Sequence, residues 1–397
     1  MLDSLGQALT GLRVLDLSRV LAGPFCTQTL ADLGAEVIKI EDPAGGDETR
    51  GWGVPYLSGL SDYFLACNRN KKSLALDLKK PEGLALLKQL VIRSDILIEN
   101  FRADSRARLG LGAADLHVLN PRLIIATVSG FGPDDPKHRP GYDYVIQGMS
   151  GMMAMNGPAA GEPYKFGVAI ADILTGIYAS TGILAALHAR EKSGEGYSFD
   201  ISLLDCAVAA QANVVQSFLC SGRQPKKQGH AHLQIVPYQL FAAVDGFLIL
   251  AVGNDNQWQR FCAATNADEL ASDSRFQTNR SRVENREILV PLIAARIRTQ
   301  PLKHWQDRLE TAGIPHGPVW TFEDLFQSSE AKRSQLRIKA RSASGATLDL
   351  VRSPLRRDQD TARLPPTLGE HSDEILRDAL GLDSEAIARL RAAGVVI

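Results

Sequence analysis

The residue with the clearest chemical potential is Asp172, within Gly167-Val-Ala-Ile-Ala-Asp172-Ile-Leu-Thr-Gly176. Apolar residues spaced by four, seven and three positions share one helix face: Ile173, Ile177, Leu184 and Leu187. The pattern predicts Asp172 at the first turn or N-cap of this helix. The free N–H groups there would keep the carboxylate ionised and attract anionic groups, and the bracketing glycines would let a ligand approach closely. From these residues alone, the plainer interpretation is a helix N-cap, a common role of aspartate.

Motifs for several other chemistries are missing from the sequence. It has no G-x-x-x-x-G-K-[ST] phosphate loop, no H-E-x-x-H or paired C-x-x-C metal motif, and no G-x-S-x-G hydrolase turn. We therefore expect no metal site. His230 and His232 could be ligands or acid–base groups, although two solvated loop histidines are the simpler interpretation. A carboxylate nucleophile remains, and an aspartyl intermediate would divide an acyl or group transfer into two easier steps.

Length and composition are those of an ordinary soluble protein. The chain has 397 residues, 45% hydrophobic and 22% charged, with a net charge of −1, which gives no global attraction to nucleic acid or an anionic membrane. This length favours two domains. Five scattered cysteines without metal-ligand spacing predict reduced thiols in a cytoplasmic protein. We expect no secretory signal and no apolar stretch of the roughly 18 residues needed to span a bilayer.

The elements that must position Asp172 alternate between short strands and helices. We predict strands at residues 13–17, 36–40, 74–78, 95–101, 122–128 and 198–202. Pro24 is expected at the first position of the first helix. The alternation favours an α/β fold with a mostly parallel, Rossmann-like sheet that carries ligands at its loop tips. Because the turn at 19–24 lacks G-x-G-x-x-G, we do not expect a nicotinamide or flavin site, despite the acidic pair Glu41-Asp42.

A change of character marks a second domain. A long apolar helix is predicted over 204–219, followed by a polar linker over 221–228 that contains Gly and Pro. Two strand patterns then flank Asp245-Gly246, a pair that favours a two-residue hairpin turn. Three helices would complete a small α+β domain: 256–264, 282–298 and 302–312. A β-like run at 347–351 and two terminal helices could return to the first domain.

Several blocks, in order, resemble the class III CoA-transferase family, of CaiB/BaiF type. They are Arg19-Val-Leu-Ala-Gly-Pro-Phe25, Gly34-Ala-Glu-Val-Ile-Lys-Ile-Glu41, Gly46-Asp47, Asn68-Arg-Asn-Lys-Lys-Ser73, Glu99-Asn-Phe101, Gly141-Tyr-Asp143 and Val168-Ala-Ile-Ala-Asp-Ile-Leu-Thr-Gly176. Further matches, such as Ile235-Val-Pro-Tyr-Gln239 and Gly369-Glu-His371, extend the similarity nearly end to end. The Asn68 to Ser73 and Ile235 to Gln239 blocks look closest to the succinyl-CoA:glutarate members.

The resemblance implies how the chain is divided into domains. It implies a large Rossmann-like CoA-binding domain over residues 1–200, completed by 340–397. A helix and linker over 201–228 would lead to a small α+β domain over 229–325, and 326–339 would form the return linker. Family members form interlocked dimers, so an interlocked homodimer is implied.

The resemblance also implies a reaction. An acyl-CoA, such as succinyl-CoA, would give its CoA to a free carboxylic acid, such as a dicarboxylate. Asp172 would be the nucleophile, forming first a mixed anhydride and then an aspartyl-CoA thioester. Since exchange of CoA between two acids is nearly isoenergetic, neither ATP nor a tightly bound cofactor is implied, and CoA enters as part of the substrate.

Matching blocks imply the remaining site residues. The CoA-binding positions are Leu21, Ala22, Leu76, Lys79, Asn100, Phe101 and Arg108. Lys79 and Arg108 would meet phosphates, and Phe101 would pack near the adenine or pantetheine. Tyr142 and Asp143 would line the acyl site. Without the resemblance, Lys79 and Arg108 would be interpreted as solvated surface charges.

Departures from the family pattern keep alternatives open. Leu21 stands where formyl-CoA transferases carry glutamine, Asp42 where they carry arginine, and residues 229–237 replace their glycine-rich loop, so formate or oxalate is not expected. The α-methylacyl-CoA racemases of the same superfamily carry a histidine where this chain has Tyr142. Tyrosine is a poor base near neutral pH, which favours the transferase. A non-enzymatic acyl-CoA-binding module is a third hypothesis.

Overall fold

The chain forms two compact units. The computed structural model describes residues 2–53, 56–57, 60–137, 139–342, 345–355 and 362–397. Unit 1 comprises Met1–Met152, Phe166–Ser221 and Arg333–Ile397, and unit 2 comprises Met153–Lys165 and Gly222–Lys332. The division differs from the sequence-based one in two places: Met153–Lys165 lies within the predicted large domain and belongs to unit 2, and residues 201–221, predicted as part of a helix and linker, belong to unit 1.

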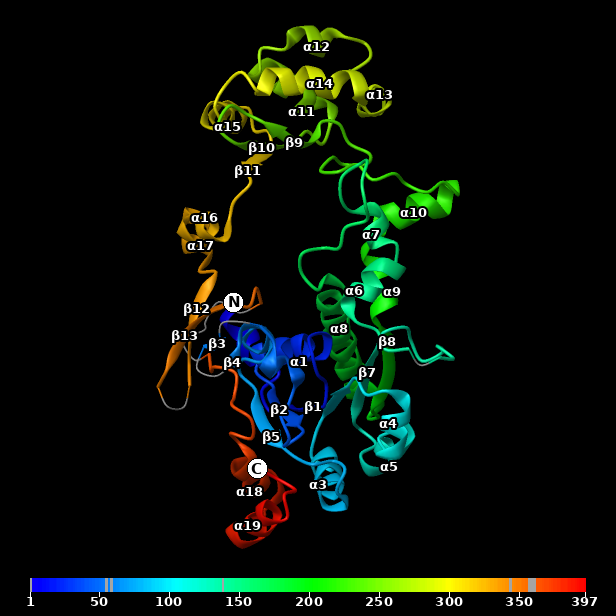
Figure 1. Cartoon of the computed structure of the whole chain (residues 1–397), viewed down its shortest axis with the longest axis vertical. Helices are drawn as coiled ribbons and strands as arrows, with labels where there is room; N and C mark the ends of the chain where they lie inside the picture. The colour runs from blue at the N-terminus through cyan, green and yellow to red at the C-terminus, as the bar shows by residue number, and fades with distance from the viewer. Residues whose placement is uncertain (1, 54–55, 58–59, 138, 343–344, 356–361) are drawn as a thin grey trace. The chain divides into compact units, whose positions relative to one another are not determined.

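A six-stranded parallel sheet forms the centre of unit 1, as Figure 1 shows. Its strands, in spatial order, are β5 (Lys72–Ala75), β2 (Glu36–Glu41), β1 (Arg13–Asp16), β6 (Ile96–Glu99), β7 (Ile124–Ser129) and β8 (Tyr197–Ser202). All six predicted strands are present, and the predicted α/β class with a parallel sheet is confirmed. The order reverses between β1 and β6, where parallel sheets open a ligand crevice beyond their carboxyl ends.

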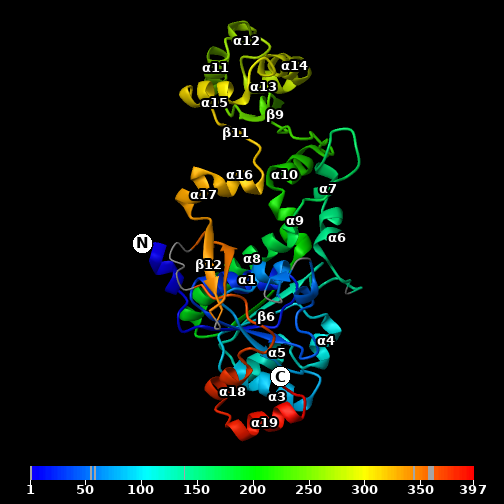
Figure 2. The ribbon, with the colours of Figure 1, turned by 60° about the vertical axis from the view of Figure 1, so that its left-hand side comes forward.

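Helices cover both faces of this sheet. On one face α1 (Ala22–Asp32) packs against α8 (Ile170–Ser193), with Leu30 and Ile183 in one apolar cluster. On the other face lie α3 (Pro81–Ile92), α5 (Ala113–Leu119), α18 (Ser372–Leu380) and α19 (Ser384–Ala392). Figure 2 shows the red α18 close to the cyan-blue α3, so the C-terminal segment completes this layer. The burial of both faces explains the nearly continuous apolar strands.

The strand predicted at 74–78 ends early because of this C-terminal segment. Leu76 forms an antiparallel bridge with Val396, and the Asp77 N–H donates to the Val395 carbonyl. The Leu76 N–H still donates to the Glu41 carbonyl of β2 (2.8 Å), and from Asp77 onward the backbone pairs with the C-terminal segment instead.

Helix α8 is long and apolar enough to cross a membrane by length and composition, contrary to the expectation from the sequence. In this fold it packs against α1, α9 (Leu203–Ala210) and β7, as a core helix does. Gly176 allows that packing, since a Cβ there would lie 2.7 Å from the Ala22 carbonyl oxygen. Gly176 thus serves the contact between α8 and α1.

Three helix predictions need correction. The helix predicted over 204–219 is two helices, α9 and α10 (Ala212–Ser221), which meet at 81° because Ala212 adopts a left-handed φ of 41°. The helix predicted over 282–298 is likewise divided at Asn285 into α13 (Asn279–Glu284) and α14 (Arg286–Ile297). Pro24 is the third residue of α1, where its missing N–H is also harmless because the first N–H groups of a helix lack intrahelical partners.

Unit 2 is built on a three-stranded antiparallel sheet, β11-β10-β9. Its strands are β9 (Tyr238–Ala242), β10 (Phe247–Ala251) and β11 (His316–Pro318). The core of unit 2 includes Trp258, Phe261 and Leu289. The Ala243 N–H donates to the Gly246 carbonyl (2.8 Å), which centres the hairpin turn on the two residues between them, one position earlier than predicted.

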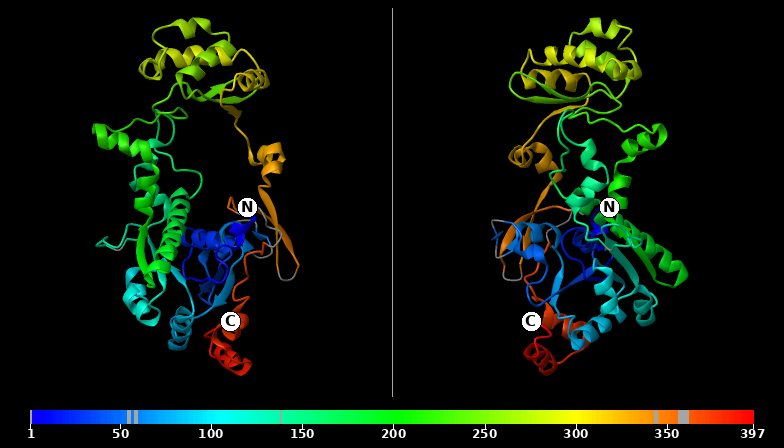
Figure 3. Two further views of the ribbon diagram at one scale, coloured as in Figure 1. Left: turned by 180° about the vertical axis from the view of Figure 1, so that it is seen from behind. Right: turned by 45° about the vertical axis from the view of Figure 1, so that its right-hand side comes forward.

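The remaining elements complete the two units. They are η1 (Leu2–Gln7), η2 (Glu48–Gly51), β3 (Tyr56–Leu57), β4 (Leu60–Ser61), α2 (Asp62–Cys67), α4 (Ala103–Arg108), α6 (Asp143–Met149), α7 (Met152–Met155), α11 (Asp255–Ala264), α12 (Asp268–Ser272), α15 (Leu302–Thr311), α16 (Phe322–Gln327), α17 (Ser329–Ser334), β12 (Arg337–Arg341) and β13 (Thr347–Val351). Figure 3 shows the orange β12–β13 hairpin beside the blue N-terminal part of unit 1, where Leu350 packs near Phe64 of α2.

Candidate active site

The loop after β1 lies at the point where the strand order reverses. Asn100, which follows β6, holds it from one side: the Arg19 N–H donates to Asn100 Oδ1 (3.0 Å), and Asn100 Nδ2 donates to the Arg19 carbonyl (2.9 Å). Both polar atoms of this side chain therefore bind the loop. Asn100 shapes the crevice through the backbone that it holds.

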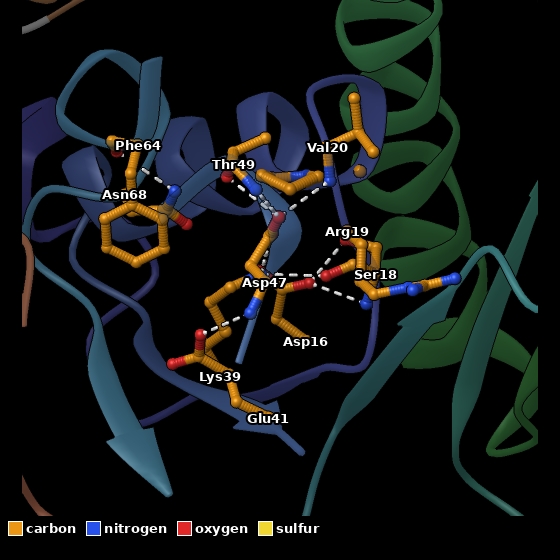
Figure 4. A network of polar contacts seen from close by, with 12 residues as sticks. Asp16, Ser18, Arg19, Val20, Lys39, Glu41, Asp47, Thr49, Phe64 and Asn68 are labelled. Carbon is orange, nitrogen blue, oxygen red and sulfur yellow. Dashed lines mark hydrogen bonds and ion pairs between the residues drawn. The ribbon is translucent and has the colours of Figure 1, made fainter. Parts of the chain in front are cut away.

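A buried polar network holds the same loop from the other side (Figure 4). Lys39 forms an ion pair with Asp47 (2.9 Å) and donates to the Ser18 carbonyl (2.8 Å), while the Val20 N–H lies 3.3 Å from Asp47 Oδ1. Val20 has a φ of 72°, a left-handed conformation that is costly for a β-branched residue. Contacts from two sides stabilise this strained backbone and make the loop a rigid wall.

Asp16, at the end of β1, anchors the base of the network. It accepts hydrogen bonds from Ser18 and Thr27 and forms an ion pair with Lys71 (3.0 Å), whose side chain is also fully buried. Burial opposes ionisation of Asp16, but the Lys71 and Lys39 ammonium groups outweigh it and hold the pKa of Asp16 well below 3.8. This carboxylate is therefore a structural anion beneath the crevice.

Asp172 lies in the first turn of α8, and Ala169 occupies the N-cap position. The interpretation of Asp172 as an N-cap is therefore wrong. The residue is only 7% exposed, and no described residue donates a hydrogen bond to its carboxylate. Burial, helped by repulsion from Asp143, raises the pKa of Asp172 to about 7. These effects outweigh the helix N-terminus, which was expected to keep the carboxylate fully ionised.

Two neighbouring cavities bring the predicted residues together. The first, of about 300 Å³, is lined by Leu21, Ala22, Asn100, Phe101, Tyr142 and Asp172. The second, of about 560 Å³, is lined by Leu76, Lys79, Phe101 and Arg108. Arg19 and Phe101 line both cavities, so the two share a wall at the reversal of strand order. A long ligand with a reactive end could occupy both.

Comparison with known proteins decides the family. A model of CoA-transferase family III matches residues 9–372. The chain belongs to CoA-transferase family III. It is 43% identical over 385 residues to the succinate–glutarate CoA-transferase of Agrobacterium fabrum, an alignment covering 93% of this chain and 95% of that protein. The resemblance drawn from the sequence blocks is thus confirmed, and the protein is a CoA-transferase.

Two further relatives span nearly the whole chain. The succinyl-CoA:glutarate CoA-transferase of Mus musculus is 38% identical over 394 residues, covering 98% of this chain and 90% of that protein. The crystal structure of a CaiB/BaiF family protein from Brucella suis is 40% identical, with a TM-score of 0.80 over 94% of this chain and 99% of that one.

Among the predicted residues of this family III enzyme, Asp143 does not lie where expected, and Lys79 and Arg108 already have partners within the protein. Asp143 lines neither cavity, and its carboxylate oxygens bind the Ala171 N–H and the Gln147 side chain. Lys79 pairs with Asp42 (2.9 Å), which leaves less of its charge for a phosphate. Arg108 binds Ser105 Oγ (3.1 Å).

Sequence reasoning missed Arg19. Its side chain is exposed and lines both cavities, and it opens the Arg19 to Phe25 block on which the resemblance depends. The sequence did not show the order of the strands in the sheet, which places this turn between the two cavities. The signal that could have identified Arg19 was its position within a block that matches the family.

The two histidines singled out in the sequence belong to unit 2. His230 Nδ1 accepts a hydrogen bond from the Leu240 N–H, and His232 Nδ1 accepts one from the Gln234 N–H. His232 also stacks on Tyr238. These contacts favour a structural role for both rings in the segment that leads into β9.

Proposed function

We propose that this enzyme transfers CoA from an acyl-CoA, with succinyl-CoA as the first candidate, to a dicarboxylic acid, through covalent intermediates on Asp172. The observation that carries the proposal is a buried carboxylate to which none of the described residues donates a hydrogen bond, on the wall of a cavity that adjoins a second one. The choice of substrates is supported by the relatives, which are a succinate–glutarate and a succinyl-CoA:glutarate CoA-transferase.

The two cavities suggest how CoA would be held. The nucleotide end would occupy the larger cavity, where Arg108 and Arg19 could meet phosphate oxygens. The pantetheine arm would pass Phe101, which lines both cavities. The thioester would then reach Asp172 in the smaller cavity, beside Tyr142.

Each bond made in the proposed reaction replaces one that breaks. An Asp172 oxygen attacks the thioester carbon, and CoA leaves as a thiolate, which forms a mixed anhydride. The thiolate attacks the Asp172 carbonyl carbon and releases the first acid, which leaves an aspartyl-CoA thioester. The acceptor carboxylate repeats these steps in reverse, so the proton count does not change. Burial of Asp172 would limit hydrolysis of the anhydride by water.

An oxygen label tests this sequence of steps. When the acceptor acid attacks the aspartyl-CoA thioester, one of its oxygens becomes the bridge of the new mixed anhydride. The CoA thiolate then attacks the acyl carbon of the acceptor, and the bridging oxygen stays on the Asp172 carboxylate. A single turnover with ¹⁸O-labelled glutarate should therefore add 2 Da to the peptide that contains Asp172, and the Asp172→Ala and Asp172→Asn variants should form no glutaryl-CoA. Glutaryl-CoA formed without label on Asp172 would overturn the covalent route.

Separate measurements test the alternatives. The relatives do not favour the racemase, for which deuterium from D₂O would enter the α-carbon of a branched acyl-CoA without new thioesters. A binding module would bind acyl-CoA without turnover.

An interlocked homodimer and a cytoplasmic location also stay predictions. Light scattering of the purified chain tests the first, and microscopy of a tagged chain in its cell of origin tests the second.

A further inference from the structure

We infer that Asp143 and Gln147, one turn apart on α6, are positioning residues that hold the segment leading into α8 and thereby place Asp172. The catalytic meaning of this inference rests on the proposed function. The matching blocks implied instead that Asp143 would line the acyl site.

Four contacts form this clamp. Asp143 Oδ1 accepts from the Ala171 N–H (2.8 Å), and Asp143 Oδ2 accepts from Gln147 Nε2 (2.7 Å). Gln147 Oε1 accepts from the Phe166 N–H (2.7 Å), and Gln147 Nε2 lies 3.3 Å from the Val168 carbonyl. Gln147 is completely buried. The two side chains therefore bind the backbone at three points between residues 166 and 171.

Helix α8 needs such a clamp because its own start supplies none. Its N-cap is Ala169, which has no side chain able to accept a hydrogen bond from the first turn. The first turn of a helix frays when its N–H groups lack partners, and a nucleophile on such a turn would no longer be held in the orientation needed for attack. The Asp143 carboxylate accepts the N–H of Ala171, the neighbour of Asp172, and so takes the place of the missing cap.

Asp143 also brings a charge. The titratable groups that act on Asp172 in the described part of the chain are Asp143 on α6 and Tyr63 on α2. Burial and the Asp172 carboxylate raise the pKa of Tyr63 to about 12, so its phenol is neutral. Asp143 thus supplies the negative charge that opposes ionisation of Asp172. Attack on a thioester moves charge off the Asp172 carboxylate, which relieves this repulsion in the transition state.

Two substitutions weigh charge against geometry. Asp143→Asn removes the charge and keeps an oxygen that can accept from Ala171, but its amide nitrogen then faces Gln147 Nε2 and that one hydrogen bond is lost. Gln147→Leu keeps the charge but removes the anchors on Phe166 and Val168. Asp205 offers a matched control, because it is an exposed carboxylate in the first turn of the neighbouring helix α9.

The experiment titrates the Asp172 carboxylate directly, by ¹³C NMR of carboxyl-labelled aspartate, with Asp172→Asn to assign the resonance. We expect Asp143→Asn to lower the titration midpoint by about one pH unit and to shift the pH profile of kcat/KM in the same direction. Gln147→Leu should leave the midpoint in place, lower kcat about tenfold or more at every pH, and speed hydrogen exchange at Ala171. Asp205→Asn should change none of these.

Each outcome decides one of the two claims. An unchanged Asp172 midpoint in Asp143→Asn, or unchanged kcat and exchange in Gln147→Leu, would overturn the clamp. A wild-type enzyme that shows no CoA transfer, together with the expected midpoint and exchange changes, would overturn the proposed function and leave the clamp standing.

Discussion

Replacing Asp172 by asparagine should make the protein more stable at neutral and alkaline pH. The pKa of Asp172 is about 7 in the folded protein and 3.8 in an unfolded chain. As pH rises from 4 to 7, the unfolded state therefore loses its proton first, and the folded state loses stability through this window. Above pH 7 the penalty is complete, and the difference between 3.8 and about 7 corresponds to roughly 4 kcal/mol.

One effect opposes this gain. A carboxylate in the first turn of a helix is stabilised by about 0.3–1 kcal/mol through the helix dipole, and asparagine loses that term. The larger loss of an N-cap does not apply, because Ala169 and not Asp172 is the cap. The cost of burying the charge is larger than the helix-dipole term. We therefore expect Asp172→Asn to raise the free energy of unfolding by roughly 3 kcal/mol at pH 8 and by almost nothing at pH 4.

Urea unfolding of the wild type and of Asp172→Asn, at several pH values and one protein concentration, measures the difference in their free energies of unfolding. Hydrogen exchange of β1 and β7 peptides identifies the transition of unit 1, to which Asp172 belongs. Asp200→Asn is the control, because Asp200 lines the same cavity but is exposed. If Asp172→Asn were less stable than wild type at pH 8, the carboxylate would be supporting the helix start, and the argument from burial would be refuted.

Four further predictions follow from the site. The value of kcat/KM should rise about tenfold per pH unit up to about pH 7 and then level off, because Asp172 must be ionised; a flat profile from pH 5 to 8 would contradict this. Asn100→Ala should cost about 1–3 kcal/mol of stability in urea titrations, as two hydrogen bonds to Arg19 are lost, and should raise KM for acyl-CoA. Arg108→Ala should raise KM for acyl-CoA roughly tenfold at low salt with kcat unchanged, and an unaltered KM would remove Arg108 from the binding site. Lys71→Met should cost about 3–5 kcal/mol, since it leaves the Asp16 carboxylate buried without its cation; a stable variant in urea unfolding would show that the pair is dispensable.

Local patterns predicted the elements well and their interruptions poorly. The six strands of unit 1 follow from runs of apolar residues, because burial on both faces leaves that pattern in the sequence itself. The 81° bend between α9 and α10 left no such pattern, since both halves are apolar and the break depends on the backbone of Ala212. The hairpin of unit 2 shows the same limit: Asp245-Gly246 indicated a turn, but the strand register places its centre one residue earlier.

By itself the sequence determined the strand and helix pattern, the helix start that carries Asp172 and, through the matched blocks, the family. Tertiary structure decided what the polar side chains do. Asn100 binds the backbone of Arg19, 81 positions away, and Asp143 caps a helix 28 positions away. The pKa of Asp172 follows from burial and from that same Asp143. Periodicity and capping rules describe neighbours along the chain, whereas these contacts depend on the order of strands in the sheet and on which helices lie over it.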